Sequence, residues 1–127
     1  MDVCCLNRPF DDQGQFRVRL EAEAVGLALV RAQSGMVHLV GSEAIEHEVS
    51  MNPYPGRRWR VAALAGAAES WVHVSDREHT RATELRLMGF GAYDALHLAC
   101  AESGAADVFL TADDRLLRTA TRHEAGL

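Results

Sequence analysis

Short apolar segments alternate with longer segments of helical periodicity along this chain, and that alternation restricts the fold more than any other feature. Aliphatic and β-branched residues dominate the short segments, which favours strands, and the longer segments repeat their apolar residues every three to four positions. Strands that alternate with helices predict a parallel sheet joined by right-handed crossovers. We therefore expect an α/β protein, with strands at about 2–5, 36–40, 71–74 and 107–111.

Helices are expected between these strands and after the last of them. The predicted spans are about 16–33, 43–50, 57–68, 76–88, 94–101 and 116–121. Ser42 and either Ser75 or Asp76 stand where side chains that cap helices are favoured. Helical spacing predicts an apolar face on the first helix and another on the third, comprising Leu20, Ala24, Leu27, Ala28 and Val30 in the first and Trp59, Val61, Leu64 and Ala65 or Ala68 in the third.

The length and composition fit one domain, residues 1–127, with an ordinary hydrophobic core. The chain has 127 residues, of which 48% are hydrophobic, enough to bury such a core. No apolar run is long enough to cross a bilayer and no leader precedes the first predicted strand, so we expect a cytoplasmic protein without a membrane partner. The three cysteines, Cys4, Cys5 and Cys100, lack CxxC spacing, and we expect reduced core residues.

All thirteen basic residues are arginines, and the chain contains no lysine. Phosphate-binding loops of the Walker type, phosphatases of the haloacid dehalogenase type and Schiff-base enzymes all need a lysine, so these classes are excluded. The net charge of −5 gives no general attraction for nucleic acid. Arginine nevertheless suits bidentate phosphate contacts, and the densest basic patch is 57–60.

Four widely spaced acids, Asp2, Glu48, Asp94 and Asp113, fall at or near the ends of predicted strands or the starts of predicted helices. An open α/β sheet builds its site in such places. Two carboxylates about 4 Å apart repel by roughly 4 kcal/mol at an effective dielectric constant near 20, and Mg²⁺ or Mn²⁺ removes that repulsion. Taken singly, Asp94 and Asp113 also suit helix caps or first turns, and Glu48 suits a solvated face. Together the four acids suggest a metal site.

Four segments in this order resemble PIN-domain proteins, most closely the VapC-like branch of bacterial toxin–antitoxin modules. They are DVCCLNRPFDDQ from residue 2, SEAIEHE from residue 42, DALHLA from residue 94 and LTADDRLL from residue 110. The resemblance implies a three-layer α/β/α fold with a central parallel sheet. Family members carry several apolar residues before the first aspartate and a final strand. Here we expect a shortened first strand and no last strand.

The same resemblance implies a metal-dependent endoribonuclease that uses Mg²⁺ or Mn²⁺, is restrained by an antitoxin and belongs to a family that commonly dimerises. Asp2, Glu48, Asp94 and Asp113 match its four acidic positions. Asp2, Asp94 and Asp113 would be direct or water-mediated metal ligands, with Glu48 beside them. Thr111 matches a hydroxyl residue that supports the site.

Some choices stay open at this point. Glu46 is the alternative to Glu48, and Asp114 is the alternative to Asp113. His97 is expected to pack against its helix rather than act as a base. Val3 and Cys4 stand where many family members have a hydroxyl residue and an asparagine. The alternative function is an impaired PIN-like module that binds an antitoxin or RNA without cleaving.

Overall fold

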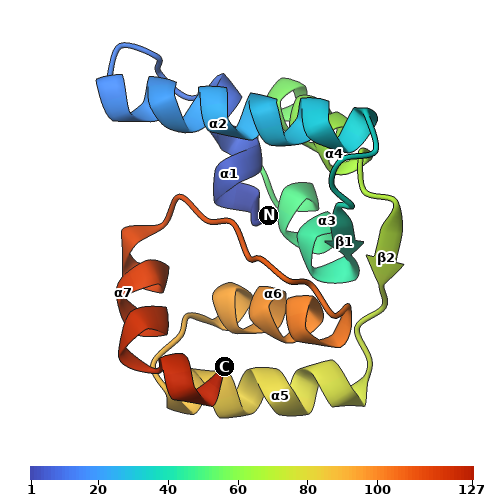
Figure 1. The fold of residues 1–127 in the computed structure, drawn as a ribbon, viewed down its shortest axis with the longest axis vertical. Helices are drawn as coiled ribbons and strands as arrows, with labels where there is room; N and C mark the ends of the chain where they lie inside the picture. The colour runs from blue at the N-terminus through green and yellow to red at the C-terminus, as the bar shows by residue number, and fades with distance from the viewer.

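The computed structural model describes residues 1–127, and helices make up most of the fold (Figure 1). The α-helices are α1 (Val3–Asn7), α2 (Phe16–Gln33), α3 (Glu43–Ser50), α4 (Pro55–Ala65), α5 (Asp76–Leu87), α6 (Ala92–Ser103) and α7 (Asp114–Arg122). Two 3₁₀ turns, η1 (Arg8–Phe10) and η2 (Glu124–Gly126), follow α1 and α7. None of the helices combines the length and apolar character that crossing a membrane requires.

The sheet consists of two short parallel strands, β1 (Val40–Ser42) and β2 (Ser70–Val72). Val40 pairs with Ser70 and Ser42 with Val72, and α3 and α4 form the crossover that a parallel pair requires. The predicted α/β fold with a parallel sheet is therefore confirmed, and no strand follows α7, as expected. The strands predicted at 36–40 and 71–74 are shorter than expected and displaced along the chain.

Two predicted strands do not form. Residues 107–111 have no regular structure, because the backbone N–H groups of 107–110 donate no hydrogen bond and no ladder is built. Residues 3–5 lie in α1 rather than in a strand. The Asp2 carboxylate accepts the Cys5 N–H at 3.0 Å, a helix N-cap, and the Asp2 N–H contacts only the Leu110 carbonyl, also at 3.0 Å. The Asp2 cap therefore starts a helix at this point, whereas a strand would need a neighbouring strand to pair with.

Several helix starts follow the predicted caps. The Ser42 hydroxyl accepts the Ile45 N–H at 3.2 Å, and Ser75 and Glu78 form a capping box at the start of α5. α2 and α3 have the predicted spans, 16–33 and 43–50. α4 begins two residues earlier than predicted, because Pro55 suits the first helical position, and it ends at Ala65.

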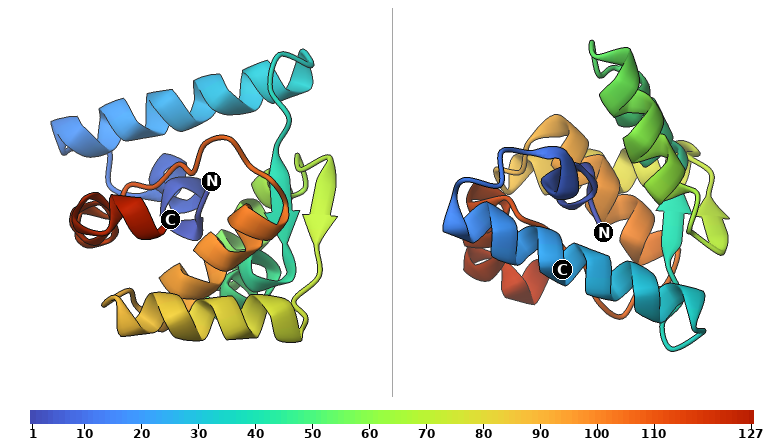
Figure 2. Two further views of the ribbon diagram at one scale, coloured as in Figure 1. Left: turned by 60° about the horizontal axis from the view of Figure 1, so that its bottom comes forward. Right: turned by 90° about the horizontal axis from the view of Figure 1, so that it is seen from above.

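The core is divided into clusters that differ in location. The largest cluster joins α5, α6 and α7 around Leu85, Phe90, Leu98 and Leu116. A second cluster joins α1, α3 and α4, and α3 also packs against α6, which connects the two parts. Figure 2 shows α2 along one edge of the molecule, with the irregular segment between α6 and α7 passing close to α1.

Some predicted core residues are exposed instead. On α2 the buried side chains are Val18, Val25 and Ala32, a single stripe with a spacing of seven residues. Leu20, Leu27 and Val30 are about half exposed, because only the buried stripe of α2 packs against the rest of the protein. Trp59 is 74% exposed, whereas Val61 on the same helix is buried. Cys5 and Cys100 are buried and reduced as predicted, but Cys4 is exposed.

Candidate metal centre

Asp94 occupies the first turn of α6, three residues after the N-cap Gly91. A side chain at Gly91 would place its Cβ 3.1 Å from the Asp94 Oδ2 atom, so glycine leaves room for this carboxylate. Burial raises the pKa of Asp94 above 3.8, and the negative charges of Asp113, Asp2 and Glu48 add to the rise, while His97 opposes it. Asp2, Glu48 and Asp113 therefore all act on Asp94, and these four residues form the acidic cluster.

Thr111 links two of these acids. Its hydroxyl donates a short hydrogen bond to the Oδ2 atom of Asp2, and its oxygen accepts the Asp113 N–H at 3.0 Å. The other Asp2 oxygen accepts the Cys5 N–H, so both oxygens of this buried carboxylate already have a donor. Thr111 thus fixes the Asp2 carboxylate and the backbone of Asp113 relative to each other.

Asp113 is the N-cap of α7, as one of the sequence alternatives predicted. Its Oδ1 atom accepts the N–H groups of Arg115 at 2.7 Å and Leu116 at 3.2 Å, and its Oδ2 atom accepts none. The neighbouring Asp114 instead pairs with Arg17 at 2.5 Å. The geometry favours Asp113 over Asp114 for the acidic cluster, because one of its oxygens remains free.

Glu48 reaches the cluster from α3 and contacts His97 of α6. The Nε2 atom of His97 lies 2.6 Å from the Oε2 atom of Glu48, and the histidine side chain is buried. Glu48 is among the charges that raise the pKa of Asp94, whereas Glu46 is exposed and is not among them. The geometry therefore favours Glu48 over Glu46.

Cys4, which was expected in the core, is instead a neighbour of this cluster. Partial burial of its thiol, with the charges of Asp2, Asp113 and Glu48, raises the pKa of Cys4 to about 11. The positive charge of Arg8 opposes this rise. Two residues at different points of the cluster, Asp94 and Cys4, thus respond to the same set of acids. Cys4 lies two residues after the N-cap Asp2. Its place beside the acids follows from helix α1, which the sequence analysis predicted as a strand.

The donor chemistry suits a hard divalent cation. Carboxylate oxygens are the ligands that Mg²⁺ and Mn²⁺ prefer, and Mg²⁺ commonly uses one or two carboxylates and keeps several waters. Asp94 accepts no hydrogen bond from the protein, and Asp113 has one free oxygen. No group of three or more histidine, cysteine, aspartate or glutamate side chains is already arranged to hold a metal ion. The acids therefore have the ligand type that a divalent cation prefers, but three or more of them are not already arranged around one point.

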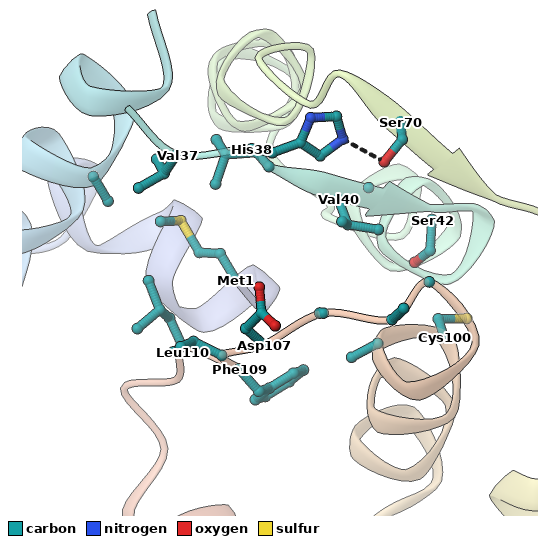
Figure 3. A pocket seen from close by; sticks show the side chains of 18 of the residues that line it. Met1, Val37, His38, Val40, Ser42, Ser70, Cys100, Asp107, Phe109 and Leu110 are labelled. Carbon is teal, nitrogen blue, oxygen red and sulfur yellow. Dashed lines mark hydrogen bonds between the residues drawn. The ribbon is translucent and has the colours of Figure 1, made fainter. Parts of the chain in front are cut away.

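A cavity lies between β1 and the irregular segment that follows α6. It has a volume of about 590 Å³ and is bounded by Met1, by residues 36–42 and by residues 104–110 (Figure 3). None of the four clustered acids lines it, and the acidic side chain in its wall is Asp107. The candidate centre is therefore a partly open group of carboxylates rather than this cavity.

A comparison with protein-family models identifies the PIN domain over residues 22–122, most of the chain. Glu48, Asp94, Thr111 and Asp113 lie within the matched range, and Asp2 lies before it. Searches of curated proteins and of solved structures gave no match. PIN domains are generally metal-dependent nucleases. The match spans both the α3 and the α6–α7 parts of the acidic cluster, and the chain belongs to the PIN domain family.

Proposed function

We propose that this protein is a cytoplasmic endoribonuclease that hydrolyses RNA phosphodiester bonds with Mg²⁺ or Mn²⁺. The observation that carries the proposal is that Thr111 joins Asp2 to Asp113 by hydrogen bonds, while burial and the charges of Asp113, Asp2 and Glu48 raise the pKa of Asp94. A group of like charges with only His97 as a basic contact is typical of a site that binds a cation.

The proposed roles follow from the free oxygens. Asp94 and Asp113 are the metal ligands with oxygens to offer, and Asp2 is a ligand that acts directly or through a water molecule. Glu48 lies beside the ligands and orients water, and Thr111 positions Asp2. A bound divalent ion supplies an activated water molecule and stabilises charge on the phosphodiester in the transition state.

Arginines near the acidic cluster support an RNA substrate. Arg115 and Arg118 lie on α7 just after Asp113, and neither forms an ion pair. Guanidinium groups bind phosphate oxygens through two hydrogen bonds, so these side chains suit the RNA backbone beside the scissile bond. The net charge of −5 requires that such contacts be local.

We propose an antitoxin as the protein partner of the nuclease. The exposed apolar side chains of α2 support a protein contact, since Phe16 is 67%, Leu27 52% and Val30 60% exposed. A homodimer would use the same kind of surface. Light scattering after gel filtration separates the two: a monomer that becomes a heteromer with its antitoxin supports the proposal, and a stable dimer alone supports self-association.

A second candidate function is an impaired PIN domain that binds RNA or an antitoxin without cleaving. It is favoured by the lack of a preassembled three-ligand group and by the two hydrogen bonds that occupy the Asp2 oxygens. In that case the four acids would be present but would not support RNA cleavage.

A ribonuclease assay separates the two functions. Purified protein is incubated with single-stranded RNA in Mg²⁺, in Mn²⁺ and in EDTA, and Asp94→Asn is compared with Glu46→Gln, an exposed acid on α3 outside the cluster. The nuclease proposal expects metal-dependent cleavage that Asp94→Asn abolishes and Glu46→Gln retains. RNA binding without cleavage under every condition would instead favour the impaired module.

A further inference from the structure

His97 and Glu48 form a contact between two helices that are far apart in the sequence. His97 lies on α6 one turn after Asp94, and its Nε2 atom is 2.6 Å from the Oε2 atom of Glu48 on α3. The side chain of His97 is 3% exposed, whereas that of Glu48 is 33% exposed. A buried group on one helix therefore holds a partly exposed carboxylate on another.

The imidazole ring has a further contact besides Glu48. Ala95, Leu98 and Ala99, its neighbours on α6, are buried in the core, and the ring of Tyr93 lies nearly parallel to it at a centroid distance of 6.1 Å. The Nδ1 atom of His97 is buried and has no hydrogen-bond partner. A buried nitrogen without a protein partner is unfavourable, so its retention needs an explanation. The ring is thus held with only one of its nitrogens in use.

We infer that His97 is a positioning residue that holds the Glu48 carboxylate against the acidic cluster, an inference that rests on the proposed nuclease function. Because the Glu48 carboxylate is an acceptor, the proton lies on Nε2 and the ring donates to Oε2. The Oε1 atom of Glu48 accepts no hydrogen bond from the protein and stays free for water or metal. A glutamate side chain has three rotatable bonds, and a fixed donor selects the rotamer that faces the cluster.

A purely structural histidine would stabilise the core without affecting the site. The two roles predict different patterns, because a positioning residue acts through Glu48 and loses its effect once that residue is changed. Glutamine can place an N–H group at about the reach of the Nε2 atom, whereas leucine fills the space without a donor. His97→Gln and His97→Leu are therefore a matched pair for the hydrogen bond.

The experiment compares wild type, His97→Gln, His97→Leu, Glu48→Gln and the double variant Glu48→Gln/His97→Leu. His79→Leu is the control, because His79 is exposed on α5. Four quantities are measured: the melting temperature, the affinity for Mn²⁺ without RNA, and kcat and KM for RNA cleavage. We expect His97→Leu to lower kcat by about 10- to 100-fold at an unchanged KM and to weaken Mn²⁺ binding, and His97→Gln to restore most of both. The double variant should be no worse than Glu48→Gln.

Three results would overturn the inference. They are a wild-type kcat in His97→Leu, a loss in His97→Leu that His97→Gln does not restore, and effects of His97→Leu and Glu48→Gln that multiply in the double variant. If the wild-type protein binds Mn²⁺ but does not cleave, the nuclease proposal fails alone, and weaker Mn²⁺ binding by His97→Leu still supports the inference. If the wild type neither binds Mn²⁺ nor cleaves, both fail.

Discussion

Glu78 and Asp94 occupy the same position in two neighbouring helices, yet their environments have opposite effects. Each is the third residue after its N-cap, Ser75 for α5 and Gly91 for α6, so the helix dipole favours both charges alike. Hydrogen bonds from the Ser103 hydroxyl and from the hydroxyl and N–H of Ser75 lower the pKa of Glu78 to about 2. Burial and neighbouring acids raise that of Asp94.

The difference separates an acid that stabilises the fold from an acid that is suited to binding a cation. Glu78 is a buried acid whose oxygens are satisfied by the protein, and it joins α5 to the end of α6 through Ser103. Asp94 accepts no hydrogen bond from the protein, and burial and neighbouring acids outweigh the opposing effect of His97 on its pKa. A carboxylate that is costly in the metal-free protein and surrounded by further acids is typical of a binding site.

The largest effect is expected for Asp94→Asn. Removing this charge should lower metal-dependent RNA cleavage by at least about 100-fold, because changes even behind the metal ligands cost 10- to 100-fold. The protein should remain folded, as judged by circular dichroism. Glu78→Gln should cleave at close to the wild-type rate at a temperature where it is folded. Equal losses in both variants would remove the distinction between the two acids.

A smaller loss is expected for Thr111→Val, which keeps the shape of the side chain but removes its hydroxyl. Asp2 then loses one donor and the Asp113 N–H loses its acceptor. We expect cleavage to fall by about 10-fold and the free energy of unfolding by about 1–2 kcal/mol. Single-turnover cleavage and urea unfolding measure the two effects. Unchanged cleavage would show that Asp2 does not need this support.

Glu78→Gln should reverse the ranking when stability is measured. Because the folded-state pKa of Glu78 is about 2 against an ordinary value of 4.5, its contribution is present above pH 4.5 and lost as the pH falls towards 2. We expect the melting temperature at pH 7 to drop by roughly 4 °C. The gap from wild type should narrow below pH 4.5. A gap that is constant with pH would contradict the assigned hydrogen bonds.

The smallest effect concerns the stability of metal-free Asp94→Asn. The folded-state pKa of Asp94 lies above 3.8, so this residue favours folding most at low pH, and that advantage is lost as the pH rises through the folded-state pKa. The variant should therefore gain on wild type between pH 4 and pH 7, by roughly 1–3 °C in melting temperature. Calorimetric scans in EDTA at both pH values measure the gain. A variant that is less stable at pH 7 than at pH 4, relative to wild type, would refute it.

Helix starts and the acids beside them could be predicted from the sequence because they depend on local chemistry. Ser42 and Asp113 cap N–H groups two or three residues further on, and Asp94 lies in the first turn of its helix. The prediction of strands at 2–5 and 107–111 was wrong, because a strand exists only if a partner pairs with it, and here the Asp2 cap starts a helix instead.

Which apolar residues of a helix are buried also could not be predicted from the local sequence. The periodicity of α2 predicted an apolar face that includes Leu20 and Leu27, but only the Val18–Val25–Ala32 stripe has neighbours to pack against. The contact between His97 and Glu48 joins positions 49 residues apart, and no spacing in the sequence indicates it. Both features depend on how the helices are placed in space.

Titration of the protein with Mn²⁺ by calorimetry tests the central claim, that the acids around Asp94 bind a divalent cation. Wild type, Asp94→Asn and Glu78→Gln are compared in metal-free buffer at pH 7 and at a temperature where all three are folded. Wild type and Glu78→Gln should each show binding that is lost or at least about 10-fold weaker in Asp94→Asn. No binding by the wild type, or equal binding by the wild type and Asp94→Asn, would contradict the claim.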